Sequence, residues 1–416
     1  MSVDVPPAAG LGRRFKVRFP DEEHYNAAQA FETASSRVPV RSAKRNFISL
    51  ELPPPLRGIS TVENILDTQL HTFEEYFGAT VVEDYRYDLE EDTRGIFDPS
   101  NFGPETPDSP SLEDVLALVR ASEAWDDSNG GQGTAIAVVD TGINGSRPEF
   151  PVGKQLGSWQ PDGDTPWTDW EGHGTMCACI TAGTTAAGGA FNGFAPNAGI
   201  IACKTHFFDT ELVAVYDYLI DLATDQGMTI VATNSFGIQT GVPPPPPPDT
   251  DFVDALKDAV AAGIHVFFSA GNYHDDAGGR PDSCDPTSIW LYKCRADVTT
   301  VATCKLDKTM WYYSSRGPGQ HHRDPEMERK PDVTAPTPQN GRIVYGDSIR
   351  SLSNGWGTSG ACPQVAGLAA LLLAKDSSLS HSAVRDTIRS SAIPSGHDEN
   401  CEGAGLIDCK KALDSI

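Results

Sequence analysis

Short apolar runs alternate with longer amphipathic segments over most of the chain after Ser111. Apolar runs bounded by turn-forming residues predict strands that are buried on both faces. Segments with apolar residues every three or four positions predict helices. Their alternation predicts an α/β fold with a doubly wound, mostly parallel sheet. The predicted strands span 135–139, 199–204, 228–233, 264–269 and 298–303, and the predicted helices span 176–182, 211–226, 251–262 and 363–374.

The first part of the chain, residues 12–92, follows a different pattern. Strand-like alternation and helix-like periodicity occur there in the order strand, helix, strand, helix, strand. This order predicts a small ferredoxin-like α+β domain. The predicted strands are 14–19, 46–52 and 80–89, with 54–59 as a further candidate, and the predicted helices are 21–36 and 62–77.

Residues 93–110 separate the two parts and contain prolines and turn formers without periodicity. Such a composition is typical of a linker. We therefore expect an N-terminal domain over 12–92, a linker over 93–110 and a large domain over 111–416. A chain of 416 residues is long enough for two domains.

Acidic residues outnumber Lys and Arg by 57 to 32, and the formal net charge is −25. A nucleic-acid partner needs a basic face, so this charge argues against one. No run approaches the roughly 18 apolar residues of a membrane span, and no basic segment leads into an apolar one at the N-terminus. We expect no membrane association and favour a cytoplasmic location, with leaderless or unrecognised export as the alternative.

The nine cysteines are many for a cytoplasmic protein, and an odd number leaves at least one thiol free. Cys284 with Cys294, and Cys401 with Cys409, are close enough in sequence to pair. Free buried thiols are an equally plausible interpretation, because sequence does not determine disulfide pairing.

Ser359 stands between glycines in Gly357-Thr-Ser-Gly-Ala-Cys-Pro, before a predicted apolar helix. A serine at a helix start is exposed, and the helix N-terminus favours developing negative charge. Both features suit a nucleophile whose product is an oxyanion. An ordinary helix cap is the plainer interpretation. Ala361 excludes the Gly-x-Ser-x-Gly turn of α/β-hydrolases.

Three further candidate catalytic residues lie at the end of a predicted strand or at the start of a predicted helix. Asp140 ends a strand, where it forms a local turn or orients a histidine; as an aspartic protease residue it would need a second such motif, which is absent. His173 lies between glycines before a helix. With Cys177 and Cys179 it also suggests zinc, but the spacing is atypical. Asn272 ends another strand, where it forms a turn or donates to an oxyanion.

The order Asp140, His173, Asn272, Ser359 is one in which serine triads occur. From about Ser111 to the C-terminus the chain resembles the subtilases. The motifs that carry this resemblance lie at 131–143, 172–175, 193–198, 234–237, 313–317, 330–336 and 357–367.

The resemblance implies a serine endopeptidase in which Asp140, His173 and Ser359 are catalytic and Asn272 binds the oxyanion. It also implies that Ser235, Phe236, Gly237 and Gly271 bind protein or peptide substrates. A cysteine after the histidine motif is similar to that of proteinase K-like members, which would place Cys177 beneath His173. No cofactor or metal is required; structural calcium is common in the family, but no loop here specifies a site.

Some positions depart from the family pattern. Gly360 follows the serine where Met is usual, and Gln364 replaces a His. Met176 and Cys179 also differ from common members, as does Thr337. None of these changes removes a proton acceptor or an oxyanion donor, so they bear on specificity and rate.

Subtilase propeptides resemble ferredoxin-like sandwiches, so the resemblance implies that residues 12–92 form an intramolecular inhibitor and folding aid. We expect self-cleavage between Asp88 and Ser111, with a permanent regulatory domain as the alternative. A peptide-maturation protease or a ligase would use the same triad, and a catalytically inactive binding protein is a third class. Asp275, Asp276, Asp282 and Asp285 follow Asn272 and leave a basic substrate preference open beside an apolar one.

Overall fold

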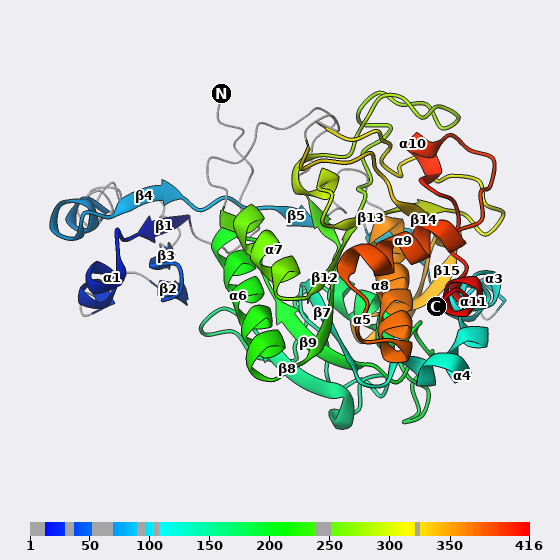
Figure 1. The fold of residues 1–416 in the computed structure, drawn as a ribbon, viewed down its shortest axis with the longest axis horizontal. Helices are drawn as coiled ribbons and strands as arrows, with labels where there is room; N and C mark the ends of the chain where they lie inside the picture. Colours follow the sequence, from blue (N-terminus) through cyan, green and yellow to red (C-terminus); the bar gives the residue numbers. More distant parts are fainter. Residues whose placement is uncertain are drawn as a thin grey trace.

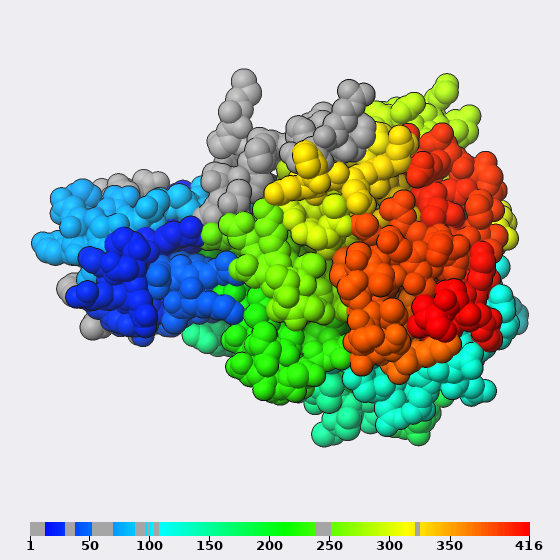
Figure 2. Space-filling model, viewed as in Figure 1, coloured from blue at the N-terminus to red at the C-terminus, as the bar shows by residue number. Residues whose placement is uncertain are grey.

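The computed structural model describes residues 13–29, 37–51, 70–89, 97, 99–103, 108–237, 251–320 and 325–416. A small N-terminal domain lies beside a large α/β domain (Figure 1). In the space-filling view this domain forms a lobe against the side of the large domain that α6 and α7 build (Figure 2). The predicted domain bounds, 12–92, 93–110 and 111–416, stay a prediction.

The large domain contains a seven-stranded sheet in the order β14-β13-β12-β10-β7-β9-β8. All neighbouring pairs are parallel, which confirms the predicted sheet. The sequence pattern missed the two edge strands, β8 and β14. The strands are β7 (Thr134–Asp140), β8 (Gln155–Trp159), β9 (Gly199–Lys204), β10 (Thr229–Asn234), β12 (His265–Ser269), β13 (Thr299–Cys304) and β14 (Val333–Pro336).

Helices cover both faces of this sheet because its central strands are apolar on both sides. In β7 every residue is buried, and successive side chains enter different cores. Ile136 and Val138 pack in the core that contains α5 (His173–Ala182) and α8 (Gly357–Lys375). Ala137 and Val139 pack with α6 (Asp209–Asp225) and α7 (Asp251–Ala261).

Helix α8 is the central helix of the larger core (Figure 1). In the described residues it is the one helix long and apolar enough to cross a membrane, but 94% of that apolar window is buried inside the protein. A core helix meets the same length and composition criteria. Its apolar character is therefore explained by packing in the large domain.

The N-terminal domain has a four-stranded antiparallel sheet in the order β2-β3-β1-β4. With a helix after the first strand and another over 70–77, this is the expected ferredoxin-like topology. The pattern missed β2, and its candidate strand at 54–59 lies outside the described residues. The elements are β1 (Arg14–Arg18), α1 (Glu22–Ala28), β2 (Arg37–Ser42), β3 (Phe47–Glu51) and β4 (Thr80–Glu83).

The predicted strand 80–89 is two strands in different sheets. β4 completes the N-terminal sheet, whereas β5 (Asp88–Leu89) pairs with β11 (Phe236–Gly237) of the large domain. Part of the linker is also structured, contrary to expectation: β6 (Phe102–Gly103) pairs with β16 (Ser348–Leu352), which pairs with β15 (Gly341–Tyr345). The remaining helices are α3 (Leu112–Leu118), α4 (Trp125–Ser128), α9 (His381–Ser391), α10 (Glu399–Glu402) and α11 (Cys409–Asp414).

One disulfide joins Cys284 to Cys401, 117 residues apart in sequence. Both pairings suggested by sequence proximity are therefore wrong, since Cys294 and Cys409 are buried free thiols. The partner of each cysteine is decided by the packing of α10 against the loop that follows β12.

Candidate active site

Asp140 and His173 meet where the carboxyl end of β7 faces the first turn of α5. Nδ1 of His173 lies 2.7 Å from Oδ1 of Asp140, and both side chains are buried. The same oxygen accepts a hydrogen bond from the N–H of Thr141. Gly174 permits this approach, because a Cβ there would lie 2.1 Å from the carbonyl oxygen of Gly142. The carboxylate thus fixes the orientation of the imidazole.

Ser359 lies in the first turn of α8, which begins at Gly357 rather than at residue 363 as predicted. Pro363 has no N–H and cannot make the helical hydrogen bond to the carbonyl of Ser359. That carbonyl instead accepts from the hydroxyl of Ser235 at 3.2 Å and from the thiol of Cys177 at 3.6 Å. Side chains from two other elements therefore hold the start of α8.

The thiol of Cys177 lies 3.9 Å from Nδ1 of His173, which confirms the placement beneath the histidine that the resemblance implies. Burial raises the pKa of Cys177 to about 11, so the group is a neutral thiol at neutral pH. Cys179 is two residues further along α5 and therefore on its other side. The predicted zinc alternative would need both thiols beside the histidine.

Asn272 lies directly against the start of α8. Its Oδ1 accepts hydrogen bonds from the N–H and the hydroxyl of Thr358, both at 3.0 Å. With the acceptor end engaged in this way, Nδ2 is the donor end that the amide presents. Gly357 has a φ of +61°, and a Cβ there would lie 3.1 Å from this Nδ2. The glycine thus supplies both the turn and the space beside the amide.

The four residues expected to bind substrate do not contribute in the same way. Ser235 supports Ser359 through its hydroxyl. The ring of Phe236 is buried in the core with α6 and α7, while its backbone and that of Gly237 form β11. The N–H of Gly271 donates to Thr358, and its carbonyl accepts from the N–H of Ser315. Both backbone hydrogen-bonding groups of Gly271 are therefore engaged within the protein.

Two carboxylates near His173 were missed by the sequence interpretation. Asp169 accepts hydrogen bonds from the N–H groups of Gly172 and Thr175, which anchors the start of α5. Glu171 accepts from the N–H of His173 at 2.9 Å and from the hydroxyl of Tyr345. Burial raises the pKa of Glu171. The sequence signal that could have identified Asp169 and Glu171 is their position just before the histidine motif at 172–175.

Segments that precede the large domain cover this site. Strand β5 pairs with β11 in antiparallel register, with Leu89 opposite Phe236. Further along, the ring of Phe97 meets the imidazole of His173 edge-on, with centroids 5.1 Å apart, and stacks on Tyr345. Both His173 and Ser359 are inaccessible to solvent.

In the described residues, one group of His, Cys, Asp or Glu side chains could share a metal ion. It consists of Asp140, His173 and Cys177, whose ligand atoms lie within 4.8 Å of one another. Thiol and imidazole are not calcium ligands. These side chains therefore do not locate the structural calcium site that the resemblance leaves open.

Comparison with known proteins places this chain in a family. The model of the Subtilase family matches residues 131–405, and the chain belongs to this family. It is 29% identical over 277 residues to Subtilisin-like protease 2 from Trichophyton tonsurans and from Arthroderma otae, covering 64% of this chain and 56% of each relative. The chain thus spans little more than half the length of these relatives.

Two bacterial proteins extend the comparison. Thermitase from Thermoactinomyces vulgaris is 29% identical over 282 residues, which are 66% of this chain and 86% of thermitase. The crystal structure of fervidolysin from Fervidobacterium pennivorans, described as a keratinolytic enzyme related to subtilisin, superposes with a TM-score of 0.63. That match covers 99% of this chain and 62% of the other at 18% identity, so it supports the fold alone.

Proposed function

We propose that this chain is a serine endopeptidase in which Ser359 is the nucleophile. Its hydroxyl attacks a peptide carbonyl while His173 accepts the proton and then donates it to the leaving amine. Asp140 orients the imidazole through Nδ1 and stabilises its positive charge. Water then hydrolyses the acyl-enzyme.

The oxyanion that forms in this reaction is bound by Nδ2 of Asn272 and the N–H of Ser359. The 2.7 Å contact between His173 and Asp140 carries the proposal, because it leaves the other imidazole nitrogen, Nε2, to act as the base. Ser235, which follows β10, donates to the carbonyl of Ser359. Asn272, which follows β12, accepts from the N–H of Thr358. Both bonds join the start of α8 to the carboxyl end of the sheet.

A fluorophosphonate probe tests this proposal directly. We expect it to label the processed wild-type protein and not the Ser359→Ala variant, and peptide hydrolysis should follow the same pattern. Absence of both labelling and hydrolysis would instead indicate a binding protein. Products that have joined an amine without adding water would indicate a ligase.

We further propose that residues 12–92 act as an intramolecular inhibitor of this enzyme. Basic side chains of β1 meet acidic residues at the first turns of α6 and α7. Lys16 lies 2.6 Å from Asp209 and 3.2 Å from Asp251, and Arg14 pairs with Glu211. These pairs are buried, so each partner needs the other to remain charged. The interaction favours a docked N-terminal domain.

The C-terminal part of this domain, from Tyr87 to Leu89, contacts the large domain through its backbone and through an aromatic ring. The N–H of Tyr87 donates to the carbonyl of Phe207, and β5 pairs with β11. The ring of Tyr87 is buried against Phe236, Phe252 and Tyr292. An aromatic side chain enclosed in this way contributes a large apolar area to docking.

Self-processing is expected between Leu89 and Phe97. Leu89 pairs with Phe236 of the strand proposed to bind substrate, and Phe97 lies against His173, so the described residues on either side of this interval both lie at the site. Mass spectrometry should find two fragments divided in this interval in the wild type and one intact chain in Ser359→Ala. An intact chain in both proteins would support a permanent regulatory domain.

A further inference from the structure

The ring of Phe97 is enclosed by three parts of the candidate active site. It meets the imidazole of His173 edge-on, with centroids 5.1 Å apart, and stacks on Tyr345 at 5.8 Å with 24° between the planes. Its Cε2 atom lies 3.6 Å from the position of a Cβ on Gly357, so the ring also lies against the start of α8. Phe97 is 4% exposed. An imidazole, a phenol ring and a helix start thus surround one aromatic side chain.

Tyr345, at the end of β15, is held in place as one wall of this enclosure. Its hydroxyl lies 2.5 and 2.6 Å from the two carboxylate oxygens of Glu171. The same carboxylate accepts a hydrogen bond from the N–H of His173. The tyrosine ring also lies against Gly172, where a Cβ would be 2.8 Å from two of its carbon atoms. Glu171 therefore ties the aromatic wall to the backbone of His173.

The place of Phe97 in the sequence indicates which side of the cleaved bond this enclosure serves. Self-processing is expected between Leu89 and Phe97, so Phe97 follows the cleaved bond and belongs to the side of the leaving amine. Consecutive residues of an extended chain are about 3.3–3.6 Å apart. A substrate side chain that contacts His173 from this side therefore belongs to the first or second residue after the bond.

We propose that His173, Tyr345 and Gly357 form a subsite that selects substrates with an aromatic side chain in the first or second position after the cleaved bond. Phe97 occupies this subsite in the unprocessed chain, and an aromatic residue of the substrate takes its place in the processed enzyme. Ring-on-ring contact with Tyr345 favours an aromatic side chain over an aliphatic one of similar size. This inference rests on the proposed function, self-processing included, and names the substrate class of that site.

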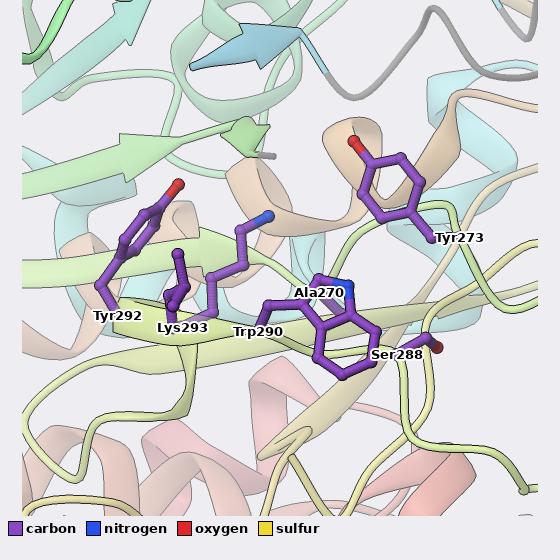
Figure 3. Close-up of a pocket in the computed structure, with 7 residues that line it drawn as sticks. Ala270, Tyr273, Ser288, Trp290, Tyr292 and Lys293 are labelled. Atoms are coloured by element: carbon purple, nitrogen blue, oxygen red, sulfur yellow. The ribbon is translucent and has the colours of Figure 1, made fainter. Parts of the chain in front are cut away.

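A second hollow near Asn272 does not offer comparable evidence. Figure 3 shows a narrow pocket lined by Ala270 and Tyr273, which lie on either side of Asn272 in the sequence. It has room for about one water molecule, which is too little for a substrate side chain. The enclosure around Phe97, by contrast, already contains a side chain of substrate size.

Phe97 stays close to the subsite after processing, because the residues that follow it are fixed to the large domain. β6 pairs with β16, and the N–H of Ser353 donates to the carbonyl of Asn101. The ring of Phe97 therefore competes with the substrate in the processed wild type. Processed Phe97→Ala, in which the subsite is open, is the more sensitive enzyme for a test.

Acyl transfer to amines tests the leaving side by itself. Processed Phe97→Ala is acylated with one peptide ester and offered dipeptide amides that carry Phe, Leu or Ala in the first or the second position and Gly in the other. Attack by an amine reverses the departure of the leaving amine, so an amine that fits the subsite competes better with water. At one of the two positions we expect Phe to capture at least about tenfold more acyl-enzyme than Ala, and about three- to tenfold more than Leu.

Processed wild type should give the same ranking with smaller ratios. The active enzyme is counted with a fluorophosphonate in each experiment. Capture of Phe amides no better than that of Leu or Ala amides by labelled Phe97→Ala, at both positions, would overturn the inference and leave the endopeptidase proposal intact. No labelling and no acyl-enzyme would refute the proposed function and this inference with it.

Substitutions of Tyr345 in the Phe97→Ala enzyme identify the ring that selects the substrate. Tyr345→Leu should lower the ratio of Phe to Ala capture to about threefold or less, whereas Tyr345→Phe keeps the ring and should keep most of the ratio. Tyr218→Leu makes the same change on α6, in the core on the other face of the sheet, and should leave the ratio unchanged. An unchanged ratio in Tyr345→Leu, or an equal loss in Tyr345→Leu and Tyr345→Phe, would overturn the assignment to this ring.

Discussion

Nδ1 of His173 lies 2.7 Å from Oδ1 of Asp140, in a site where both side chains are excluded from solvent. A carboxylate in this position requires the proton on Nδ1, so that Nε2 is the nitrogen able to accept a proton from Ser359. The carboxylate also stabilises the imidazolium that forms during the reaction. The contact therefore links the end of β7 to the proposed chemistry.

Asp140→Asn should lower kcat about 10⁴-fold, because the amide can hold the wrong tautomer of His173. Peptide hydrolysis by the enzyme, normalised to the folded fraction, measures the effect. Asp386→Asn makes the same change on the exposed face of α9, where the side chain is 70% accessible, and should leave kcat unchanged. A loss of less than tenfold in Asp140→Asn would show that this carboxylate does not orient the base.

Asn272→Ala should lower kcat by about 10²- to 10³-fold with a small effect on KM, because it removes an oxyanion donor used in the transition state. Asn272→Asp tests the same donor with nearly unchanged shape and should also be strongly impaired. Steady-state kinetics with one peptide measures both variants. An increase in KM at constant kcat would instead assign Asn272 to ground-state binding.

Docking of the N-terminal domain should weaken as pH rises between about 4 and 7. Burial raises the pKa of Asp84 to about 7, with Asp209 adding to the shift and Lys16 and Thr210 opposing it. The docked state therefore binds a proton that an exposed aspartate, with a pKa near 4, releases. This contribution is fully present below about pH 4 and is lost as pH rises through 7.

Hydrogen exchange of full-length Ser359→Ala, corrected for intrinsic rates, measures this opening without self-cleavage. We expect roughly a fiftyfold increase in the opening equilibrium from pH 5 to pH 7, as pKa values of about 4 in the open and about 7 in the docked state require. Adding Asp84→Asn should remove most of that dependence, because the amide does not titrate. A pH dependence equal in both proteins would assign it to another group.

Phe97→Ala should raise kcat/KM of the processed enzyme for a short peptide by about three- to tenfold. The ring covers His173, and losing its buried area favours the uncovered state. Phe102→Ala is the matched control, because Phe102 contacts Tyr345 from the same segment. Equal kinetics for Phe97→Ala and wild type would mean that processing already displaces this segment.

Cys284→Ser should lower the free energy of unfolding by about 2–5 kcal/mol, because the disulfide to Cys401 closes a long loop. Chemical denaturation of full-length Ser359→Ala, with and without the added substitution, measures the difference. Reductant should affect only the protein that has the disulfide. Equal stability of the two oxidised proteins would contradict a structural role for this bond.

Much of the fold could be predicted because its signals are local. Strands such as 135–139 are buried on both faces and therefore consist of continuous apolar runs. The edge strands β8 and β14, and the pair β15 and β16, lack such runs and were missed. A strand that is held mainly by hydrogen bonds to its neighbour, and is not buried on both faces, has only a weak pattern of apolar residues in its sequence.

The sequence by itself determined the candidate catalytic side chains, because Asp140, His173, Asn272 and Ser359 each lie in a motif recognisable from its own neighbours. Only the tertiary structure decided that Cys284 bonds to Cys401 and that Phe97 covers His173. Each of these relationships depends on contacts between residues distant in sequence. Chain packing sets such contacts, and no local pattern of apolar and polar residues encodes them.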